Sequence, residues 1–369
     1  MRIAIDGRAL LGQSTGIGTY TRGIARALIA QGHEAALFAP RALPPGAADG
    51  IPVFARWHPS GTLWAQVALP RAARRFGADI LLAALTIAPR AAETPVASVV
   101  HDLTAWTHPE WHARRTVAGF LPNWERTAER AACLLCVSQT TARELLALYP
   151  ETAPRVRVAE NGVDEEFAPG GDSVSREAAR RRFAGGNRFV LYLGTLEPRK
   201  NIGALVAACE RLWAKRRARP DLVLAGGMGW KTSGLLRRIA RSPFRDKIHL
   251  TGYASREAAV ALYRAAEVFV YPSLSEGFGL PVAEAMACGT PVVISTADAL
   301  REVAGDAALA APPRDVAELA RCIERALEDS DTRERLRAEG PARARRYSWE
   351  NAGARTAAAL SEAVAGAHR

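Results

Sequence analysis

The chain has 369 residues, 49% of them hydrophobic, which is enough for two packed domains of ordinary size. No apolar run reaches the roughly 18 residues of a membrane span, and Asp6 and Arg8 interrupt the N-terminal apolar stretch. We therefore expect a cytoplasmic protein without a membrane-spanning helix or a signal peptide. The net charge of +11 comes mostly from arginines spread over helical stretches, without a zinc-finger, RNP-type or basic-zipper pattern, so we expect no nucleic-acid partner.

The first half of the chain alternates apolar strands with helical patterns. A strand is predicted at 2–6, a loop at 7–18 and a helix at 19–32 that ends at Gly32. Further strands are predicted at 35–39, 79–85, 95–100, 133–138 and 155–161. Strands that are apolar throughout and alternate with helices indicate a parallel sheet covered on both faces.

A segment rich in Gly, Pro and Ser at 167–175 predicts a linker, after which the alternation restarts. Strands are predicted at 188–195, 221–227, 247–252, 267–273 and 290–296, and helices near 314–328, 331–346 and 348–365. The predicted fold class is α/β, with two doubly wound domains facing a cleft. The first comprises 1–168, joined by the last helix (348–369), and the second comprises 169–347. Ligands of such sheets bind beyond the carboxyl ends of the strands.

Five cysteines are scattered along the chain, which argues against a disulfide framework. Cys133 and Cys136 have the spacing of half a zinc or redox motif. They lie in a predicted strand, where residues three apart point to opposite faces. We therefore expect two buried thiols and no metal site.

Three loops at strand ends could approach phosphate. Gly16-Ile17-Gly18 occupies the first βα turn, where a dinucleotide-binding fold places its glycines, although the third glycine of that fingerprint is missing. The stretch GGMGWKTS (226–233) resembles a P-loop, but Trp230 stands where the glycine before the lysine belongs. Arg199 and Lys200, in LGTLEPRKN (193–201), could neutralise a diphosphate leaving group or could be ordinary surface cations.

The stretch SEGFGLPVAE (275–284) places two carboxylates, Glu276 and Glu284, around a glycine-rich turn. Pro281 suits the first turn of a helix, so the exposed N–H groups at that helix start could hold an anion. Ionised carboxylates accept hydrogen bonds, for which hydroxyl groups are natural donors. The stretch therefore suits a ligand with an anionic centre and hydroxyls on either side, as in a nucleotide sugar. A capping Glu276 and a surface Glu284 are the alternative.

These motifs together resemble a known enzyme family. SEGFGLPVAEAMACGTPVV (275–293) is similar to the signature of the family 4 glycosyltransferases, which have the GT-B fold of two Rossmann-like domains. The resemblance continues in GIGTYTRGIARAL (16–28), HDLTAWTHPEW (101–111), NGVDEEF (161–167) and LGTLEPRKNI (193–202), in the order of the family. It implies retaining transfer of a hexose from a nucleotide-diphosphate sugar.

The resemblance also implies roles for individual residues. Glu284 would bind the ribose hydroxyls and Glu276 the donor hexose, while Arg199 and Lys200 would stabilise the departing charge. His101 would reach the transferred sugar, although a packed histidine at a strand end is equally compatible with the sequence. The remaining donor-binding positions are Gly16, Gly18, Tyr253, Ala254, Gly277, Phe278, Gly279 and Leu280.

One position departs from the family pattern. Many relatives have an arginine directly after the strand glycine, whereas this chain has Thr195. The resemblance therefore implies that Arg199 takes over that duty, and Lys200 is the closer equivalent of a family residue. No metal or other cofactor is expected, because two cations and a helix N-terminus would hold the diphosphate.

The implied reaction is front-face transfer, in which the leaving phosphate takes the proton of the acceptor hydroxyl. The similar GTLEPRKN proteins are bacterial mannosyl- or rhamnosyltransferases of surface polysaccharides, lipopolysaccharide among them. They imply GDP-mannose as donor and a glycan or lipid-linked glycan as acceptor. Two alternatives stay open: an epimerase or hydrolase of nucleotide sugars, and a non-catalytic sugar-nucleotide binding protein. The segment 56–77 combines tryptophans with arginines, which suits a weak peripheral contact with the inner face of the membrane or an ordinary amphipathic surface helix.

Overall fold

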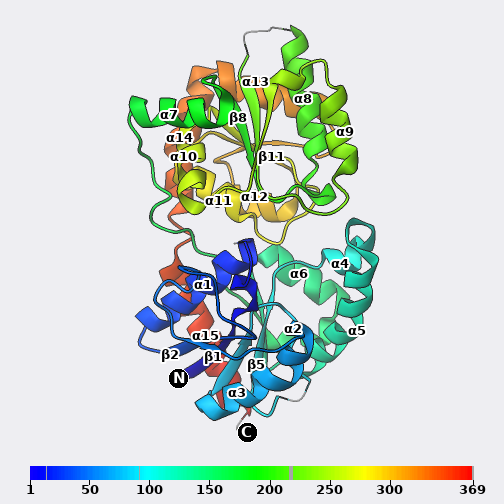
Figure 1. Ribbon diagram of the computed structural model, residues 1–369, viewed down its shortest axis with the longest axis vertical. Helices are drawn as coiled ribbons and strands as arrows, with labels where there is room; N and C mark the ends of the chain where they lie inside the picture. The colour runs from blue at the N-terminus through cyan, green and yellow to red at the C-terminus, as the bar shows by residue number, and fades with distance from the viewer. Residues whose placement is uncertain (14, 91, 216–218, 368–369) are drawn as a thin grey trace. The chain divides into compact units, whose positions relative to one another are not determined.

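The computed structural model describes residues 1–13, 15–90, 92–215 and 219–367 (Figure 1). The chain forms two compact units: unit 1 comprises Met1–Gly162 and Tyr347–Arg369, and unit 2 comprises Val163–Arg346. The predicted boundary at 168/169 therefore shifts, because 163–168 pack with unit 2. Arg264 donates to the carbonyls of Glu166 and Ala168 (2.9 Å each), and the ring of Phe167 lies 5.9 Å from that of Tyr263.

Unit 1 is built on a seven-stranded sheet of order β3-β2-β1-β4-β5-β6-β7, in which every pair is parallel. The strands are β1 (Arg2–Asp6), β2 (Glu34–Ala39), β3 (Val53–Ala55), β4 (Ile80–Ala83), β5 (Val96–Val100), β6 (Cys133–Cys136) and β7 (Val156–Val158). The order reverses between β1 and β4, where Ile3 pairs with Ala35 on one side and Ile80 on the other. This is the switch point of a doubly wound sheet, and ligands bind at its carboxyl edge.

Helices cover both faces of this sheet (Figure 1). One face carries α1 (Gly16–Ala30) and the C-terminal α15 (Trp349–Ala367), which pack against each other. A Cβ on Gly23 of α1 would lie 2.3 Å from the indole of Trp349, so only glycine permits this approach. The remaining helical segments of unit 1 are η1 (Gly7–Leu10), α2 (Gly61–Leu63), η2 (Trp64–Ala68), α3 (Leu69–Phe76), α4 (Thr104–Thr107), η3 (Pro109–Trp111), α5 (Arg114–Arg130), α6 (Gln139–Leu148) and η4 (Pro150–Arg155).

Unit 2 contains a six-stranded parallel sheet of order β10-β9-β8-β11-β12-β13. The strands are β8 (Phe189–Leu193), β9 (Asp221–Ala225), β10 (Ile248–Gly252), β11 (Val268–Tyr271), β12 (Val292–Ser295) and β13 (Leu309–Ala311). Because β8 and β11 are neighbours, the loops that follow them start from the same edge of the sheet. Both units therefore have the predicted doubly wound α/β architecture.

The helices of unit 2 also cover both sheet faces, with α8 and α9 on one side and α7 and α10 on the other (Figure 1). They are α7 (Ser173–Ala184), η5 (Pro198–Lys200), α8 (Ile202–Lys215), α9 (Ser233–Arg241), η6 (Arg245–Lys247), α10 (Arg256–Ala265), α11 (Leu280–Ala287), α12 (Asp298–Ala304), α13 (Val316–Glu328) and α14 (Ser330–Ala344). Within the described ranges, no helix combines the length and the apolar character needed to span a bilayer.

The prediction of a loop at 7–18 was wrong at its end. Helix α1 already begins at Gly16, and Thr15 caps it by accepting a hydrogen bond from Gly18 N at 3.4 Å. Gly16 and Gly18 therefore lie in the first helical turn rather than in the preceding loop. The pattern missed this start because a Thr N-cap outweighs the low helix propensity of the two glycines.

Candidate active site

Two neighbouring loops at the carboxyl edge of the unit 2 sheet carry most of the predicted charged residues. The loop after β8 leads into η5 with Arg199 and Lys200, and the loop after β11 carries Glu276. Their backbones are joined directly, because Leu274 N donates to Arg199 O at 2.8 Å. The amide of Asn201 adds a second link by donating to Pro272 O at 3.1 Å.

Four charged side chains meet between these loops: Glu197, Arg199, Lys200 and Glu276, which we name the charged quartet. Arg199 Nη1 donates to Glu276 Oε2 at 2.7 Å, and Arg199 Nη2 donates to Glu197 Oε1 at 3.0 Å. Lys200 Nζ donates to Glu276 Oε1 at 2.6 Å. Their side chains are between 5% and 12% exposed, so two cations and two carboxylates balance each other largely out of water.

The quartet fixes the charge state of its members. Burial alone would raise the pKa of Glu276, but the charges of Arg199 and Lys200 outweigh it and lower the pKa to about 2. Burial and the neighbouring Arg199 lower the pKa of Lys200, and Glu276 only partly opposes this. Glu276 is thus a carboxylate at neutral pH. Arg199 and Lys200 both donate to Glu276, so an anion that took the place of this carboxylate would meet two buried cations.

A tyrosine of the sheet contacts the ammonium group of Lys200. Its Nζ donates to the hydroxyl of Tyr271 at 2.6 Å and lies 5.0 Å from the centre of the Tyr271 ring. Tyr271 in turn stacks on Tyr192, with ring centres 5.8 Å apart, and both rings are fully buried. Because these rings come from β11 and β8, the position of Lys200 is fixed by the sheet itself.

The glycine-rich turn ends at the N-terminus of α11. Gly279 has φ +99°, which favours glycine, and a Cβ there would lie 2.5 Å from Leu300 Cδ2. As the residue before the helix, Gly279 offers no side chain that could cap the first turn. Pro281 occupies that turn, as predicted. Gly277, Phe278 and Leu280 complete a buried turn at this helix start.

Glu284 lies one turn into α11, and its side chain is partly exposed. Its Oε2 accepts a hydrogen bond from the hydroxyl of Tyr263 at 3.0 Å. Burial raises the pKa of Glu284 to about 8; Tyr263 lowers it, and Asp164 raises it further. The two glutamates of the SEGFGLPVAE stretch therefore have opposite pKa shifts. Glu276 sits among cations, whereas the surroundings of Glu284 favour the protonated form.

His101 belongs to unit 1 and directly follows β5. Its Nε2 is 2.8 Å from Ala84 O, and since a carbonyl only accepts, Nε2 carries a proton. Burial lowers the pKa of His101, partly opposed by this bond and by Asp102. The neutral ring therefore presents Nδ1 as its acceptor atom. The ring also packs edge-on against Tyr20, with centres 5.2 Å apart.

The remaining predicted donor-binding residues lie at other places. Tyr253 and Ala254 line a hollow of about 610 Å³ formed by α7, β10 and the start of α10, together with His249 and Arg182. Gly16 and Gly18 are in unit 1, on α1. The structure thus brings Arg199, Lys200 and Glu276 into contact. Glu276 is followed directly by the turn 277–280, and Glu284 lies on α11, which begins at Leu280.

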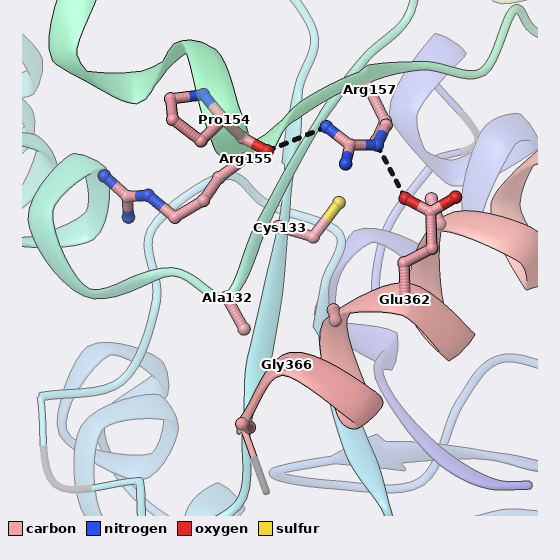
Figure 2. A pocket seen from close by; sticks show the side chains of 10 residues that line it. Ala132, Cys133, Pro154, Arg155, Arg157, Glu362 and Gly366 are labelled. Carbon is pink, nitrogen blue, oxygen red and sulfur yellow. Dashed lines mark hydrogen bonds and ion pairs between the residues drawn. The ribbon is translucent and has the colours of Figure 1, made fainter. Parts of the chain in front are cut away.

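Unit 1 has a further cavity, of about 340 Å³, at the amino ends of β6 and β7 (Figure 2). Arg157 of β7 bridges it by donating to Glu362 of α15 at 2.9 Å, and the thiol of Cys133 lies between β7 and α15. Burial raises the pKa of Cys133 to about 12. Cys136 faces the opposite side of the sheet, in the cluster around Trp124, so the predicted pair of buried thiols is confirmed.

Sequence reasoning missed three residues that complete the site. Glu197 binds Arg199, Tyr271 binds Lys200, and Tyr263 binds Glu284. Glu197 stands in the LEPRKN stretch, and its proximity to two cations was a signal. The two tyrosines lie in patterns typical of a buried strand and a buried helix face. No local pattern distinguishes them from other core residues.

Comparison with known proteins places this geometry in a family. Residues 14–167 match the family described as Glycosyltransferase Family 4, and residues 174–343 match Glycosyl transferases group 1. The crystal structure of Anabaena Alr3699/HepE in complex with UDP and glucose is similar over 98% of this chain and 99% of that one, with a TM-score of 0.78 and 20% identity. This likeness concerns the fold.

Curated relatives are more similar in sequence. The O-antigen chain mannosyltransferase B of Escherichia coli is 36% identical over 68% of this chain and 66% of its own length. The serotype-specific mannosyltransferase WbdA of E. coli is 34% identical over 60% of this chain, and the match spans only 28% of WbdA. Two family matches that together span most of the chain, on a pair of doubly wound units, show that it belongs to the family 4 glycosyltransferases.

Proposed function

We propose that this chain is a retaining glycosyltransferase that moves a hexose from a nucleotide-diphosphate sugar to a glycan or lipid-linked glycan. The observation that carries the proposal is the charged quartet beside the start of α11. Arg199 and Lys200 are held there by a carboxylate that a diphosphate could replace. Anions bind well at helix N-termini and to arginine and lysine.

The proposed chemistry is positioning and charge stabilisation. The bond between the anomeric carbon and the diphosphate oxygen breaks, and Arg199 and Lys200 take up the charge that develops on that oxygen. The acceptor hydroxyl attacks the anomeric carbon on the same face, and its proton passes to the leaving phosphate. Glu276, released from the cations, would accept hydrogen bonds from the hexose, and Glu284 from the ribose.

In the same proposal His101 accepts a hydrogen bond from the transferred sugar through Nδ1. The turn 277–280 offers backbone amides to the diphosphate, and Tyr253 and Ala254 lie near the base. Gly16 and Gly18 keep the start of α1 open for a phosphate. Transfer proceeds without a metal ion, so activity should persist in the presence of a chelator.

We propose mannose, from GDP-mannose, as the donor sugar. Support comes from the two E. coli relatives, which are named as mannosyltransferases. Since this chain spans 66% of the first and 28% of the second, their acceptors guide the search rather than define it. Lipid-linked or free mannose-containing glycans are the acceptors to try first.

A weak contact with the inner face of the membrane forms part of the proposal. Leu63 and Val67 follow each other by one helical turn and are 60% and 43% exposed. Arg71 and Arg75, on the following helix α3, are also exposed. Exposed apolar side chains followed by arginines suit an anionic bilayer surface. Changing Leu63 and Val67 to Ser should abolish co-sedimentation with anionic vesicles and leave transfer to a water-soluble acceptor unchanged.

The decisive experiment measures thermal stabilisation by GDP, UDP and ADP, with and without Mg²⁺, and then transfer from the matching sugar nucleotides. A ligand at 100 times its Kd stabilises by about 2.7 kcal/mol. Stabilisation by GDP together with transfer to mannosides supports the proposal, and a UDP preference would overturn the donor. Sugar release or rearrangement without an acceptor would indicate a hydrolase or epimerase. Binding without turnover would indicate a binding protein.

A further inference from the structure

Glu197 is the member of the charged quartet that the proposed reaction leaves without a role. It is 7% exposed, and its Oε1 accepts from Arg199 Nη2 at 3.0 Å. A carboxylate beside a diphosphate site weakens anion binding by repulsion. Glu197 therefore calls for a role other than contact with the diphosphate.

The backbone of Leu196, directly before Glu197, is bonded to the segment that follows β9. Leu196 N donates to Gly227 O and Gly229 N donates to Leu196 O, both at 2.9 Å. A Cβ on Gly229 would lie 2.6 Å from Leu196 O and 3.2 Å from Glu197 Cβ. The GGMG segment thus closes against the loop after β8, which explains Gly229 without a P-loop function. Glu197 is a fixed point rather than a mobile surface acid.

Arg199 has hydrogen-bond acceptors on two sides, and in the proposed function a diphosphate replaces only one of them. On one side, Nη1 donates to the backbone carbonyl of Ser275 at 2.8 Å and to Glu276 at 2.7 Å. On the other side, Nη2 donates to Glu197. When a diphosphate replaces Glu276, the Ser275 carbonyl and Glu197 still hold the guanidinium at both of its ends. An acceptor at each end restricts the rotation of a rigid, planar guanidinium.

We propose that Glu197 is a positioning residue for glycosyl transfer, which orients the guanidinium of Arg199 so that Nη1 faces the diphosphate oxygen during bond cleavage. The inference rests on the proposed function and deepens it. It also fits the presence of Thr195 where many relatives have an arginine. Arg199 takes over that duty from a different position in the loop, so it needs an orienting partner of its own. Glu276 is the exchangeable partner of the quartet and Glu197 the permanent one.

Positioning and charge balance make different predictions for kcat. The quartet is neutral overall, and removal of Glu197 leaves one net positive charge. If Glu197 only balanced charge, its removal would tighten nucleoside diphosphate binding and leave kcat unchanged. If it orients Arg199, kcat falls because Arg199 loses its alignment in the transition state, while binding does not weaken.

The test uses the full chain with Glu197→Gln, Glu197→Asp, Arg199→Ala and the double variant Glu197→Gln/Arg199→Ala. Glu210→Gln is the matched control, because Glu210 pairs with Arg238 at 2.6 Å elsewhere in unit 2. We expect Glu197→Gln to lower kcat at least tenfold, with the Kd for GDP within threefold of wild type or tighter. In the Arg199→Ala background the same change should alter kcat less than twofold.

Glu197→Asp keeps the charge and shortens the side chain, so it should also lower kcat, whereas charge balance predicts wild-type turnover for it. Turnover within twofold of wild type for both Glu197 variants would overturn the inference. An equal loss in the Arg199→Ala background would do so too, because it would show an action independent of Arg199. If the wild-type protein binds no nucleoside diphosphate, the proposed function itself fails, which the binding measurement distinguishes.

Discussion

Replacing Glu284 by Gln should remove a pH dependence from the stability of unit 2. The pKa of Glu284 is about 8 in the folded protein against 4.5 as its ordinary value, because burial disfavours the charged form. The folded state therefore keeps a proton that the unfolded chain loses above 4.5. The stability contributed by this group is fully present below pH 4.5 and is lost as the pH rises through 8.

The magnitude follows from the linkage between protons and folding. When the pH rises from 5 to 8, a single group with this shift lowers the free energy of unfolding by about 3 kcal/mol. Glutamine has the same shape and its amide oxygen can still accept from Tyr263, so the variant should lack only this pH-dependent part. Glu284→Gln should consequently be stabilised relative to wild type, by more at pH 8 than at pH 5.

Urea unfolding at pH 5, 6.5 and 8, followed by circular dichroism, measures this difference. Glu177→Gln is the control, because Glu177 forms an exposed ion pair with Arg181 on α7 and should show the wild-type profile. Carbon-13 NMR of the Glu284 carboxyl group gives its pKa directly. Parallel pH profiles for wild type and Glu284→Gln would refute the assignment of a protonated Glu284.

Three other changes have defined outcomes. Lys200→Met should weaken GDP binding at least about tenfold in calorimetry, since a buried cation that faces the anion site is lost; an unchanged Kd would remove Lys200 from the site. Gly279→Ala should cost about 2 kcal/mol in urea unfolding, because φ is +99° and the new Cβ would meet Leu300 at 2.5 Å; wild-type stability would mean that the turn relaxes freely. Gly23→Ala should cost about 2 kcal/mol or more and open the C-terminal helix to proteolysis, because its Cβ would overlap the indole of Trp349; an unchanged cleavage pattern would contradict this.

The sequence predicts the architecture well because each signal is local. Apolar strands and amphipathic helices alternate regularly, and periodicity alone indicates two parallel sheets. The family signature then selects Glu276, Glu284, Arg199 and Lys200. Whether these residues contact one another depends on the pairing of β8 with β11, which joins segments about 76 positions apart, as the bond from Lys200 to Glu276 shows.

The failures of prediction concern features that tertiary contacts decide. The first helix starts earlier than its glycines suggest, because Thr15 caps it. The segment 163–168 joins unit 2 through Arg264, which lies far along the chain. Tyr271 was predicted as part of a strand, but its contact with Lys200 appears only once the loop after β8 is folded back over the sheet edge.

The C-terminal helix α15 has a consequence for how the protein is made. Unit 1 takes its last helix from 347–369, whereas all of unit 2 lies between this helix and the rest of unit 1 in the chain. During vectorial synthesis, unit 2 can therefore complete its fold on the ribosome while unit 1 still exposes the face of α1 that Trp349 will cover. Of the two units, the one that is synthesised earlier is thus the one that is completed later. A premature stop near residue 346 would release a chain with a complete second unit and an open, aggregation-prone first one.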